Sequence, residues 1–272
     1  MVLNENFNLS NGKAIPSLAF GTWQISNEDV VDAVKCALKI GYRHIDTAAA
    51  YENEKGVGQA IKESGIDREN IFITTKIPAE IKTYEGAKKS IEDSLEYLGV
   101  DSIDLMLIHA PRPWDQMFSG TDKTYFEENL EVYKAMEEAY NDGKIRSLGV
   151  SNFDERDLKN IFDNCTVKPV VNQIQVHIGF TRFELINYCK ENDVLVMAYA
   201  PNATGKLPGN SEVGEIAKTY NVSTPQLSIR YDYQLGLLPI PRSTNPDHIK
   251  ENAMIDFEIK EDDMEKLYKV TI

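Results

Sequence analysis

The 272-residue chain carries 43 acidic against 29 basic side chains, and its formal net charge of −14 argues against nucleic acid or an anionic membrane surface as a partner. Its hydrophobic fraction of 42% is ordinary for a globular protein, and no apolar stretch approaches the length of a membrane span. The N-terminal segment MVLNENFNLSNGK lacks the pattern of a secretory signal. We therefore expect one soluble domain over residues 1–272.

Three cysteines, Cys36, Cys165 and Cys189, lie far apart in the chain. Their odd number and the lack of a CxxC pair predict neither a disulfide framework nor a zinc site. We expect reduced thiols in a cytoplasmic protein that needs no metal.

Short runs rich in β-branched residues alternate with segments of helical periodicity along the whole chain. Eight runs are candidate strands: LAFGT from residue 18, RHIDT from 43, IFITT from 71, IDLMLI from 103, IRSLGV from 145, VVNQIQV from 170, VLVMAY from 194 and LLPI from 237. This alternation predicts a parallel (β/α)8 barrel. An open doubly wound sheet is the main competitor, but it usually carries GxGxxG after its first strand, where this chain has GTWQ.

Capping signals predict where several helices begin: a capping box at Ser26 and Asp29, a second at Thr181 and Glu184, and an N-cap at Thr224 before Pro225. An apolar stripe before Gly99 predicts a further helix, with Ala87, Ile91, Leu95 and Leu98 on one face. Ahead of the first strand, FNLSNGKAIP predicts a β-hairpin that turns at Asn11-Gly12 and closes the bottom of the barrel. The segment 111–126, which contains Gly, Pro and Trp, is a candidate pocket-side loop.

Polar side chains stand at or just after the C-terminal ends of seven predicted strands: Asp46, Lys76, His109, Ser151, Asn152, Gln173, Tyr199, Arg242 and Ser243. Each alone has an ordinary structural explanation, such as a helix cap or a solvated charge. Together they predict one polar cavity, because a barrel gathers these strand ends at a single face, where barrel enzymes carry their chemistry.

Tyr51 follows Asp46 closely and is a candidate proton donor for a carbonyl oxygen. A free tyrosine titrates at about 10, so we expect the ammonium of Lys76 to lower the pKa of Tyr51, with Asp46 as the counter-ion of the lysine. His109 is suited to donate a hydrogen bond to the substrate oxygen. This set favours carbonyl reduction, in which negative charge grows on that oxygen.

A redox cofactor must share this cavity, because no side chain delivers hydride. Ser151, Asn152 and Gln173 offer the donors and acceptors that a nicotinamide carboxamide needs. Tyr199 is suited to stack on the nicotinamide ring, although it would serve equally well as a core aromatic.

Long motifs in this chain resemble the aldo-keto reductase family, in particular bacterial members such as diketogluconate and glyoxal reductases. The resemblance spans nearly the whole chain, through GYRHIDTAAAYENEKGVG (41–58), ITTK (73–76), SLEYLGVDSIDLMLIHAP (94–111), GKIRSLGVSNF (143–153), VNQIQVH (171–177) and IPRSTNPDHIKEN (240–252). It implies NADPH-dependent reduction of aldehydes and ketones.

The resemblance also implies roles for single residues. The implied catalytic set is Asp46, Tyr51, Lys76 and His109, with Tyr51 as the general acid, and the implied nicotinamide contacts are Ser151, Asn152, Gln173 and Tyr199. Arg242 and Ser243 would reach the 2′-phosphate of the cofactor, and Glu251 and Asn252 would reach the adenine.

The chain departs from the family pattern at several positions. Arg242 and His248 stand where lysine and arginine are usual, and because His248 lacks a permanent charge we expect a preference for NADPH that tolerates NADH. Ala110 replaces a frequent tryptophan, which either widens the pocket or leaves Trp114 to fill it, and Trp23 is expected to form a pocket wall.

Two further departures concern the cofactor and the pocket opening. Ala200 and Asn202 replace the usual serine and leucine after the seventh strand, so the sequence does not predict which groups bind the pyrophosphate of the cofactor. The chain ends soon after its last helix, which predicts an open pocket for small or varied carbonyl compounds.

Two other interpretations compete with a carbonyl reductase. One is a non-catalytic nicotinamide-binding barrel that acts as a redox-sensing or regulatory subunit. The other is an unrelated barrel enzyme, but a glycosidase needs two facing carboxylates and only Asp46 stands at a central strand end. A Schiff-base aldolase could use Lys76 yet would leave the 240–252 motif unexplained. We expect a monomer whose partner is a small carbonyl substrate.

Overall fold

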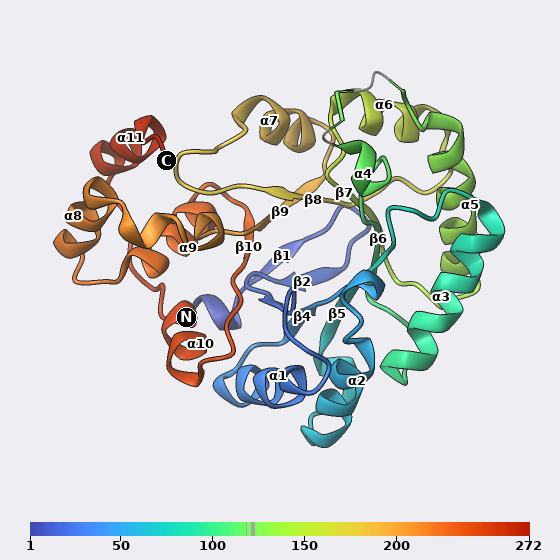
Figure 1. The fold of residues 1–272 in the computed structure, drawn as a ribbon, viewed down its shortest axis with the longest axis horizontal. Coiled ribbons are helices and arrows are strands. Elements are labelled where there is room, and N and C mark those ends of the chain that lie inside the picture. The colour runs from blue at the N-terminus through green and yellow to red at the C-terminus, as the bar shows by residue number, and fades with distance from the viewer. Residues whose placement is uncertain (118, 121–122) are drawn as a thin grey trace.

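The computed structural model describes residues 1–117, 119–120 and 123–272, and its centre is a barrel of eight parallel strands (Figure 1). The strands pair with their neighbours in chain order: β3 (Phe20–Gly21), β4 (His44–Asp46), β5 (Phe72–Ile77), β6 (Leu105–Ile108), β7 (Leu148–Ser151), β8 (Val171–Gln175), β9 (Leu195–Tyr199) and β10 (Leu238–Ile240). Backbone bonds from Ala19 N to the Pro239 carbonyl (3.1 Å) and from Gly21 N to the Pro241 carbonyl (2.9 Å) join the first and last strands. The predicted (β/α)8 barrel and its eight strands are confirmed.

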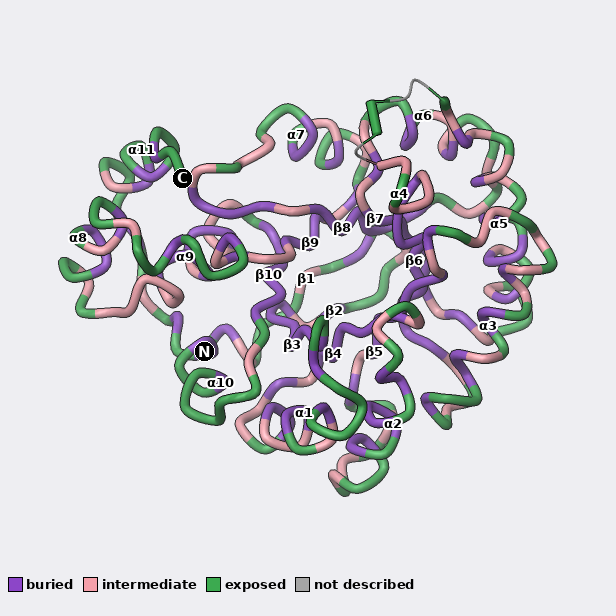
Figure 2. Tube along the Cα trace, viewed as in Figure 1, coloured by how far each residue is buried: buried purple, intermediate pink, exposed green. Residues whose placement is uncertain are grey.

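Helices surround the barrel, with their outer sides exposed and the strands buried (Figure 2). Their bounds are α1 (Asp29–Ile40), α2 (Glu54–Glu63), α3 (Tyr84–Leu98), α4 (Trp114–Met117), α5 (Phe126–Asn141), α6 (Glu155–Asn164), α7 (Phe183–Glu191), α8 (Ser211–Thr219), α9 (Thr224–Gln234), α10 (Pro246–Ala253) and α11 (Glu261–Lys269). The largest hydrophobic cluster lies between these helices and the strands, and a smaller one joins α8, α9 and α11 through Val213, Leu227 and Leu267.

The predicted hairpin is present as β1 (Asn6–Asn8) and β2 (Ala14–Pro16), which pair antiparallel. Gly12 adopts a φ of 81° in the turn, a conformation that favours glycine. Leu9 and Ile15 of this hairpin share a buried cluster with Leu105 and Val171 from the strands, and Asn11 Nδ2 donates to Ser147 Oγ at 3.0 Å just before β7. The hairpin therefore covers the N-terminal end of the barrel, as predicted.

The capping predictions meet mixed outcomes. Asp29 N donates to Ser26 Oγ at 3.0 Å, as expected, although the Ser26 hydroxyl rather than its backbone amide bonds the Asp29 carboxylate. The capping box at Thr181 is wrong, because the Thr181 hydroxyl is taken by Tyr231 and α7 begins without a side-chain cap. The N-cap at Thr224 is also wrong, since Ser223 forms the capping box with Gln226 and the helix begins one residue earlier.

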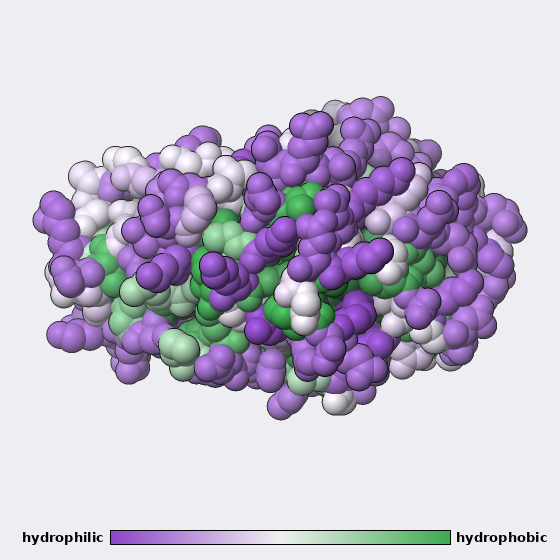
Figure 3. Space-filling view, turned by 90° about the horizontal axis from the view of Figure 1, so that it is seen from below, coloured by the Kyte–Doolittle hydropathy of each residue, from purple (hydrophilic) through white to green (hydrophobic). Residues whose placement is uncertain are grey.

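The apolar stripe on α3 is confirmed. Its four predicted members are all buried, and Gly99 ends the helix in the left-handed region at a φ of 64°. Within the described residues, no helix combines the length and the apolar character needed to cross a membrane. The face in Figure 3 is mostly hydrophilic, with hydrophobic residues visible between the hydrophilic ones.

Gly58 lets α2 approach the end of α3 closely. A Cβ atom at Gly58 would lie 2.7 Å from the carbonyl carbon of Leu98 and 2.9 Å from its Cα. Because the obstacle is backbone, a side chain at this position forces the two helices apart. Glycine costs helical stability here but permits the contact on which the α2–α3 packing rests.

We predict that Gly58→Ala lowers the free energy of unfolding by about 1–3 kcal/mol through overpacking. Gly214→Ala is the matched control: Gly214 also lies inside a helix, but no atom stands within 4 Å of the position that its Cβ would take, so alanine should be neutral or stabilise by about 0.5–1 kcal/mol. Urea denaturation of both variants measures the difference, and equal midpoints would contradict the close approach.

Candidate active site

The buried ion pair of Lys76 and Asp46 lies at the centre of the barrel mouth. Lys76 comes from β5 and Asp46 ends β4, and these strands are neighbours in the sheet. Lys76 Nζ donates to Asp46 Oδ1 at 2.8 Å and to the Thr47 carbonyl at 2.7 Å, while Gln173 Nε2 donates to Asp46 Oδ2 at 2.7 Å. The lysine side chain is 0% exposed and the aspartate side chain 5%, so each charge depends on the other.

Burial lowers the pKa of Lys76 from its usual value, and the carboxylate of Asp46 opposes that shift. Two of the three ammonium protons are committed to Asp46 and Thr47. The third is left for another acceptor. The predicted role of Asp46 as the counter-ion of Lys76 is confirmed by this geometry.

Tyr51 is held over this pair by a buried asparagine. The tyrosine ends the short 3-10 helix η2 (Ala49–Tyr51). Asn53 fixes the turn that follows, because its amide donates to the carbonyls of Thr22 (2.9 Å) and Ile25 (3.0 Å) and accepts from the Thr47 hydroxyl (2.7 Å). Lys76 Nζ lies 5.0 Å from the centroid of the Tyr51 ring.

The expectation that Lys76 lowers the pKa of Tyr51 is wrong for this structure. Burial raises the pKa of Tyr51 well above its usual value, and the charge of Asp46 adds to the rise. The reason is that burial disfavours the charged phenolate more than the ammonium of Lys76 favours it. Tyr51 therefore stays a phenol, and its hydroxyl has no hydrogen-bond partner among the described residues, so it is free to donate to a bound oxygen.

His109 follows β6 and packs edge-on against Tyr51, with ring centroids 5.5 Å apart. The histidine is 7% exposed, and its Nδ1 is buried without a hydrogen bond in the described structure. Burial lowers the pKa of His109 to about 3, and the charge of Lys76 contributes. The ring is thus neutral at physiological pH and carries one N–H to offer a substrate oxygen.

Ser151, Asn152, Gln173 and Tyr199 come together beside the ion pair. Tyr199 OH donates to Asn152 Oδ1 at 2.8 Å, and the Ser151 hydroxyl donates to the Gln173 backbone carbonyl at 2.9 Å. Burial raises the pKa of Tyr199 to about 12. The side-chain oxygen of Gln173 has no hydrogen-bond partner within the described residues, so it remains an acceptor for a ligand.

The residues predicted to bind the adenosine phosphate and the adenine lie on the loop after β10 and on α10. Arg242 is exposed and uses one N–H on Gln24 Oε1 at 3.1 Å, which leaves the rest of its guanidinium for a ligand. Ser243 Oγ accepts from Asn245 N at 3.0 Å in the same turn. On α10, His248 and Glu251 are exposed and Asn252 is buried.

The two tryptophans predicted as pocket walls differ in their contacts. Trp114 begins α4 and stands edge-on to His109, with ring centroids 5.2 Å apart. Trp23 is 46% exposed in the loop after β3. Residues 118, 121 and 122 of the predicted pocket-side loop lie outside the described residues, and the part that is described brings Trp114 to the barrel mouth.

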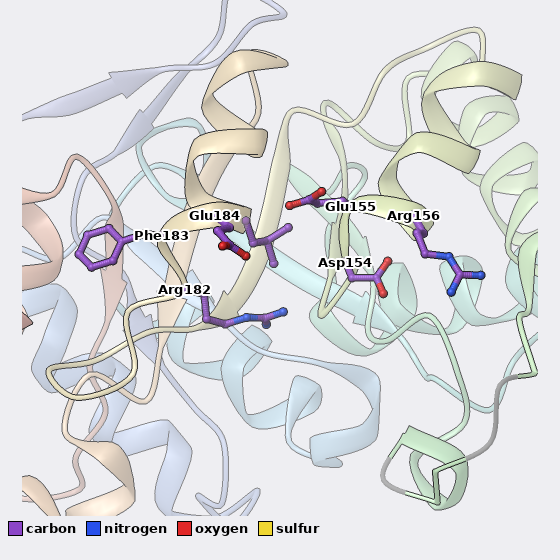
Figure 4. A pocket seen from close by; sticks show the side chains of 7 residues that line it. Asp154, Glu155, Arg156, Arg182, Phe183 and Glu184 are labelled. Atoms are coloured by element: carbon purple, nitrogen blue, oxygen red, sulfur yellow. The ribbon is translucent and has the colours of Figure 1, made fainter. Parts of the chain in front are cut away.

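A hollow of about 650 Å³ lies between the loops that follow β7 and β8 (Figure 4). Its lining carries both signs of charge, from Asp154, Glu155, Arg156, Arg182 and Glu184, with Phe183 and Leu185. In Figure 4 the Arg182 side chain extends toward Asp154, whereas Arg156 points away. None of the predicted catalytic side chains lines this hollow, so its size does not make it the centre of the chemistry.

Sequence reasoning missed Glu54 and Asn53, which stand inside the motif at 41–58. Glu54 is 2% exposed, accepts from Thr75 Oγ1 at 2.6 Å, and its charge favours the ammonium of Lys76. Burial raises the pKa of Glu54. The signal for both was their place directly after Tyr51, although nothing in that spacing shows that they turn inward.

The comparisons with known proteins agree with this geometry. A model of the Aldo/keto reductase family matches residues 17–272. The chain belongs to the aldo/keto reductase family. It is an NAD(P)H-dependent oxidoreductase.

The reductase is similar to several known relatives over nearly its whole length. It is 40% identical to the glyoxal reductase of Bacillus subtilis, in a match that covers 97% of this chain and 92% of that protein. It is 38% identical to the 9,11-endoperoxide prostaglandin H2 reductase of Trypanosoma cruzi, with the same coverage. The crystal structure of a Bombyx mori aldo-keto reductase in complex with NADP superposes with a TM-score of 0.86 at 34% identity and covers 97% of this chain and 92% of its own.

We predict that His109 stays neutral from pH 8 to pH 5, because its folded pKa is about 3. The unfolded histidine takes up a proton near 6.5, so His109 favours unfolding only as the pH falls below that value. The chain has four histidines, and proton NMR of their rings, with His109→Asn for assignment, measures the titration. An inflection of the His109 signal near pH 6.5 would contradict the burial of this ring.

Proposed function

We propose that this reductase converts small aldehydes and ketones to alcohols with NADPH as the hydride donor and Tyr51 as the proton donor. The observation that carries the proposal is the free Tyr51 hydroxyl beside neutral His109 and the buried Lys76–Asp46 pair. These groups offer a carbonyl oxygen two uncharged donors with a positive charge behind them. Such an arrangement stabilises negative charge as it develops on that oxygen.

The residues present fit a nicotinamide cofactor. Gln173 Oε1 is an unused acceptor that suits the NH2 group of a carboxamide. The Ser151 hydroxyl and the Asn152 amide stand beside it and would exchange their present bonds to protein atoms for bonds to the carboxamide. Arg242 and Ser243 suit a phosphate at the other end of the molecule. When bound, NADPH supplies the hydride that no side chain provides. The NADP bound in the Bombyx mori relative supports this choice.

Tyr51 and His109 divide the work on the substrate oxygen. Both donate hydrogen bonds to the carbonyl oxygen, which orients the carbon for reduction. As the oxygen gains charge, the Tyr51 hydroxyl transfers its proton to it and the product leaves as an alcohol. Lys76 stabilises the phenolate that remains on Tyr51, and Asp46 keeps the lysine charged in its buried position.

A small dicarbonyl compound is the substrate class that we favour, with methylglyoxal as the test compound. Trp114 stands edge-on to His109 and gives the described part of the pocket an aromatic wall, whereas Ala110 is buried. The resemblance to a glyoxal reductase at 40% identity supports the same class.

The preference for NADPH over NADH is proposed to be modest. His248 provides no permanent charge beside Arg242. A hollow of about 460 Å³ near this segment is lined by Thr244 and Pro246 on one side and by Glu28, Asp29 and Asp32 on the other. Those carboxylates repel a phosphate that binds nearby, which reduces the advantage of the 2′-phosphate.

We predict that Tyr51→Phe lowers kcat for methylglyoxal about 10²–10⁴-fold, because the variant lacks the proton donor. The Kd for NADPH should stay within about twofold, since the phenol is directed at the substrate oxygen. NADPH absorbance decay and fluorescence titration measure the two quantities. Tyr97→Phe is the matched control, because Tyr97 is 41% exposed and remote from the site residues on α3.

Two outcomes would change the proposal. If Tyr51→Phe keeps wild-type turnover, Tyr51 is not the proton donor. If the wild type binds NADPH but reduces none of a broad carbonyl panel, the non-catalytic nicotinamide-binding barrel becomes the better description.

We predict that His248→Arg tightens NADPH binding about fivefold and leaves NADH unchanged, because an exposed charge–phosphate contact contributes about 1 kcal/mol. Fluorescence titrations with both cofactors measure the ratio. Lys250→Arg is the control, since it is exposed on the same helix and adds no charge. A parallel gain for NADH would show that residue 248 does not sense the 2′-phosphate.

A further inference from the structure

Three consecutive backbone carbonyls after β6 each accept a hydrogen bond from a different side chain. The His109 carbonyl accepts from Asn152 Nδ2 at 3.0 Å. The Ala110 carbonyl accepts from Lys82 Nζ at 2.9 Å, and the Pro111 carbonyl accepts from Asn129 Nδ2 at 2.9 Å. A loop backbone bonded at every successive carbonyl has little freedom to shift, so the position of His109 is fixed by groups outside its own strand.

Lys82 and Asn129 act as one unit, which we call the loop clamp. Lys82 Nζ donates to Asn129 Oδ1 at 2.8 Å, so the two donors that hold residues 110 and 111 are also bonded to each other. Asn129 lies on the inner side of α5 and is 1% exposed, and Lys82 precedes α3. Nothing in the roles proposed for the catalytic and cofactor residues uses either side chain.

The electrostatic surroundings keep Lys82 in place as a cation. Burial lowers the pKa of Lys82 to about 8, and nearby carboxylates, with Glu80 the strongest, oppose that shift. Lys82 Nζ also lies 6.0 Å from the ring of buried Tyr125. Burying part of an ammonium costs free energy unless its protons are hydrogen-bonded. The bonds from Lys82 to a backbone carbonyl and an amide oxygen offset that cost, and they also hold the loop in position.

Two neighbours of the loop clamp, Tyr125 and Glu80, contact α4, which begins with the tryptophan that packs against His109. Tyr125 OH donates to Gln116 Oε1 at 2.6 Å on α4, and the backbone N–H of Trp114 donates to Glu80 Oε1 at 3.4 Å. Trp114 in turn stands 5.2 Å from the His109 ring, centroid to centroid. Because α4 (Figure 1) begins with Trp114, a shift of the loop after β6 would move this ring relative to His109.

We propose that Lys82 and Asn129 are positioning residues that set where His109 and Trp114 meet the substrate, and so tune both the rate and the choice of carbonyl compound. This inference rests on the proposed carbonyl reduction. Its physical reason is that a hydrogen-bond donor displaced by about 1 Å from the reacting oxygen can cost about 100-fold in rate. The loop clamp prevents such a displacement without touching substrate or cofactor.

The first experiment compares steady-state kinetics of Lys82→Met and Asn129→Asp. Asn129→Asp keeps the acceptor for Lys82 but replaces the donor to the Pro111 carbonyl by a repelling oxygen. We expect kcat per NADPH-binding site to fall about tenfold in each, with a raised KM for methylglyoxal and an unchanged Kd for NADPH. Lys82→Arg should recover most of the loss, because a guanidinium keeps donors for both acceptors.

Lys88→Met is the matched control. Lys88 pairs with Glu138 at 2.7 Å on the exposed side of α3, so this variant removes a lysine ion pair without touching the loop clamp. Its kcat and KM should equal those of the wild type. A role in folding alone would lower the number of NADPH-binding sites and leave kcat per site and KM unchanged.

The second experiment follows the loop without depending on activity. The chain has two tryptophans, so Trp23→Phe leaves Trp114 as the single reporter. In that background, Lys82→Met and Asn129→Asp should shift the Trp114 emission to longer wavelength and increase its quenching by acrylamide, whereas Lys88→Met should do neither.

The two experiments have separate ways to fail. The proposal is overturned if both clamp variants match Lys88→Met in KM, kcat per site and Trp114 emission. If Lys82→Met does not fold, the result for Asn129→Asp alone decides. Loss of rate in Lys82→Met and Lys82→Arg alike, with unchanged Trp114 emission, would also overturn it. If the wild type reduces no carbonyl compound, the proposed function fails, while the emission of Trp114 still tests the hold on the loop.

Discussion

Lys76 and Asp46 form an ion pair between side chains that are almost completely buried, with Lys76 Nζ 2.8 Å from Asp46 Oδ1. Leaving either charge unpaired there would be strongly destabilising, so both side chains must be present and correctly aligned for the barrel mouth to exist in this form. Neighbouring strands supply them, and Gln173 from β8, on the far side of the barrel, bonds the remaining carboxylate oxygen. The pair therefore links three strands and fixes a positive charge near the place where a carbonyl oxygen would bind.

The groups around this pair are uncharged because burial makes charge costly. His109 takes up no second ring proton until about pH 3, and Tyr51 keeps its hydroxyl proton well beyond its ordinary range. Both are consequently neutral donors, while the single ammonium behind them supplies the electrostatic attraction. Under the proposed function, hydrogen bonding to the substrate oxygen and stabilising its charge would fall to different side chains.

The surrounding loops hold these groups with side chains that carry no chemistry of their own. Asn53 bonds the carbonyls of Thr22 and Ile25 and so fixes the turn after Tyr51, and the loop clamp does the same for the segment after His109. Gly58 permits α2 to pack closely against the end of α3. Rigid loops around a catalytic set reduce the ordering that substrate binding would otherwise require.

Local pattern in the sequence determined the barrel, because strand runs with helical segments between them admit few topologies, and parallel closure brings Asp46, Lys76 and His109 to one end whatever else happens. It did not determine which hydroxyl caps a helix. The Thr181 hydroxyl, for example, is hydrogen-bonded to Tyr231, which lies 50 residues away in the chain. It also gave the wrong direction for the pKa of Tyr51.

Only the tertiary structure decided burial and long-range pairing. Asp232 on α9 is 0% exposed, neither of its carboxylate oxygens has a hydrogen bond within the described residues, and burial raises its pKa well above the usual value. Lys82 and Asn129 are 47 positions apart in the chain, yet their side chains are hydrogen-bonded to each other. The physical reason is common to these cases: periodicity along a chain reports which residues share a face, whereas the free energy of a charge or a donor depends on everything packed against it.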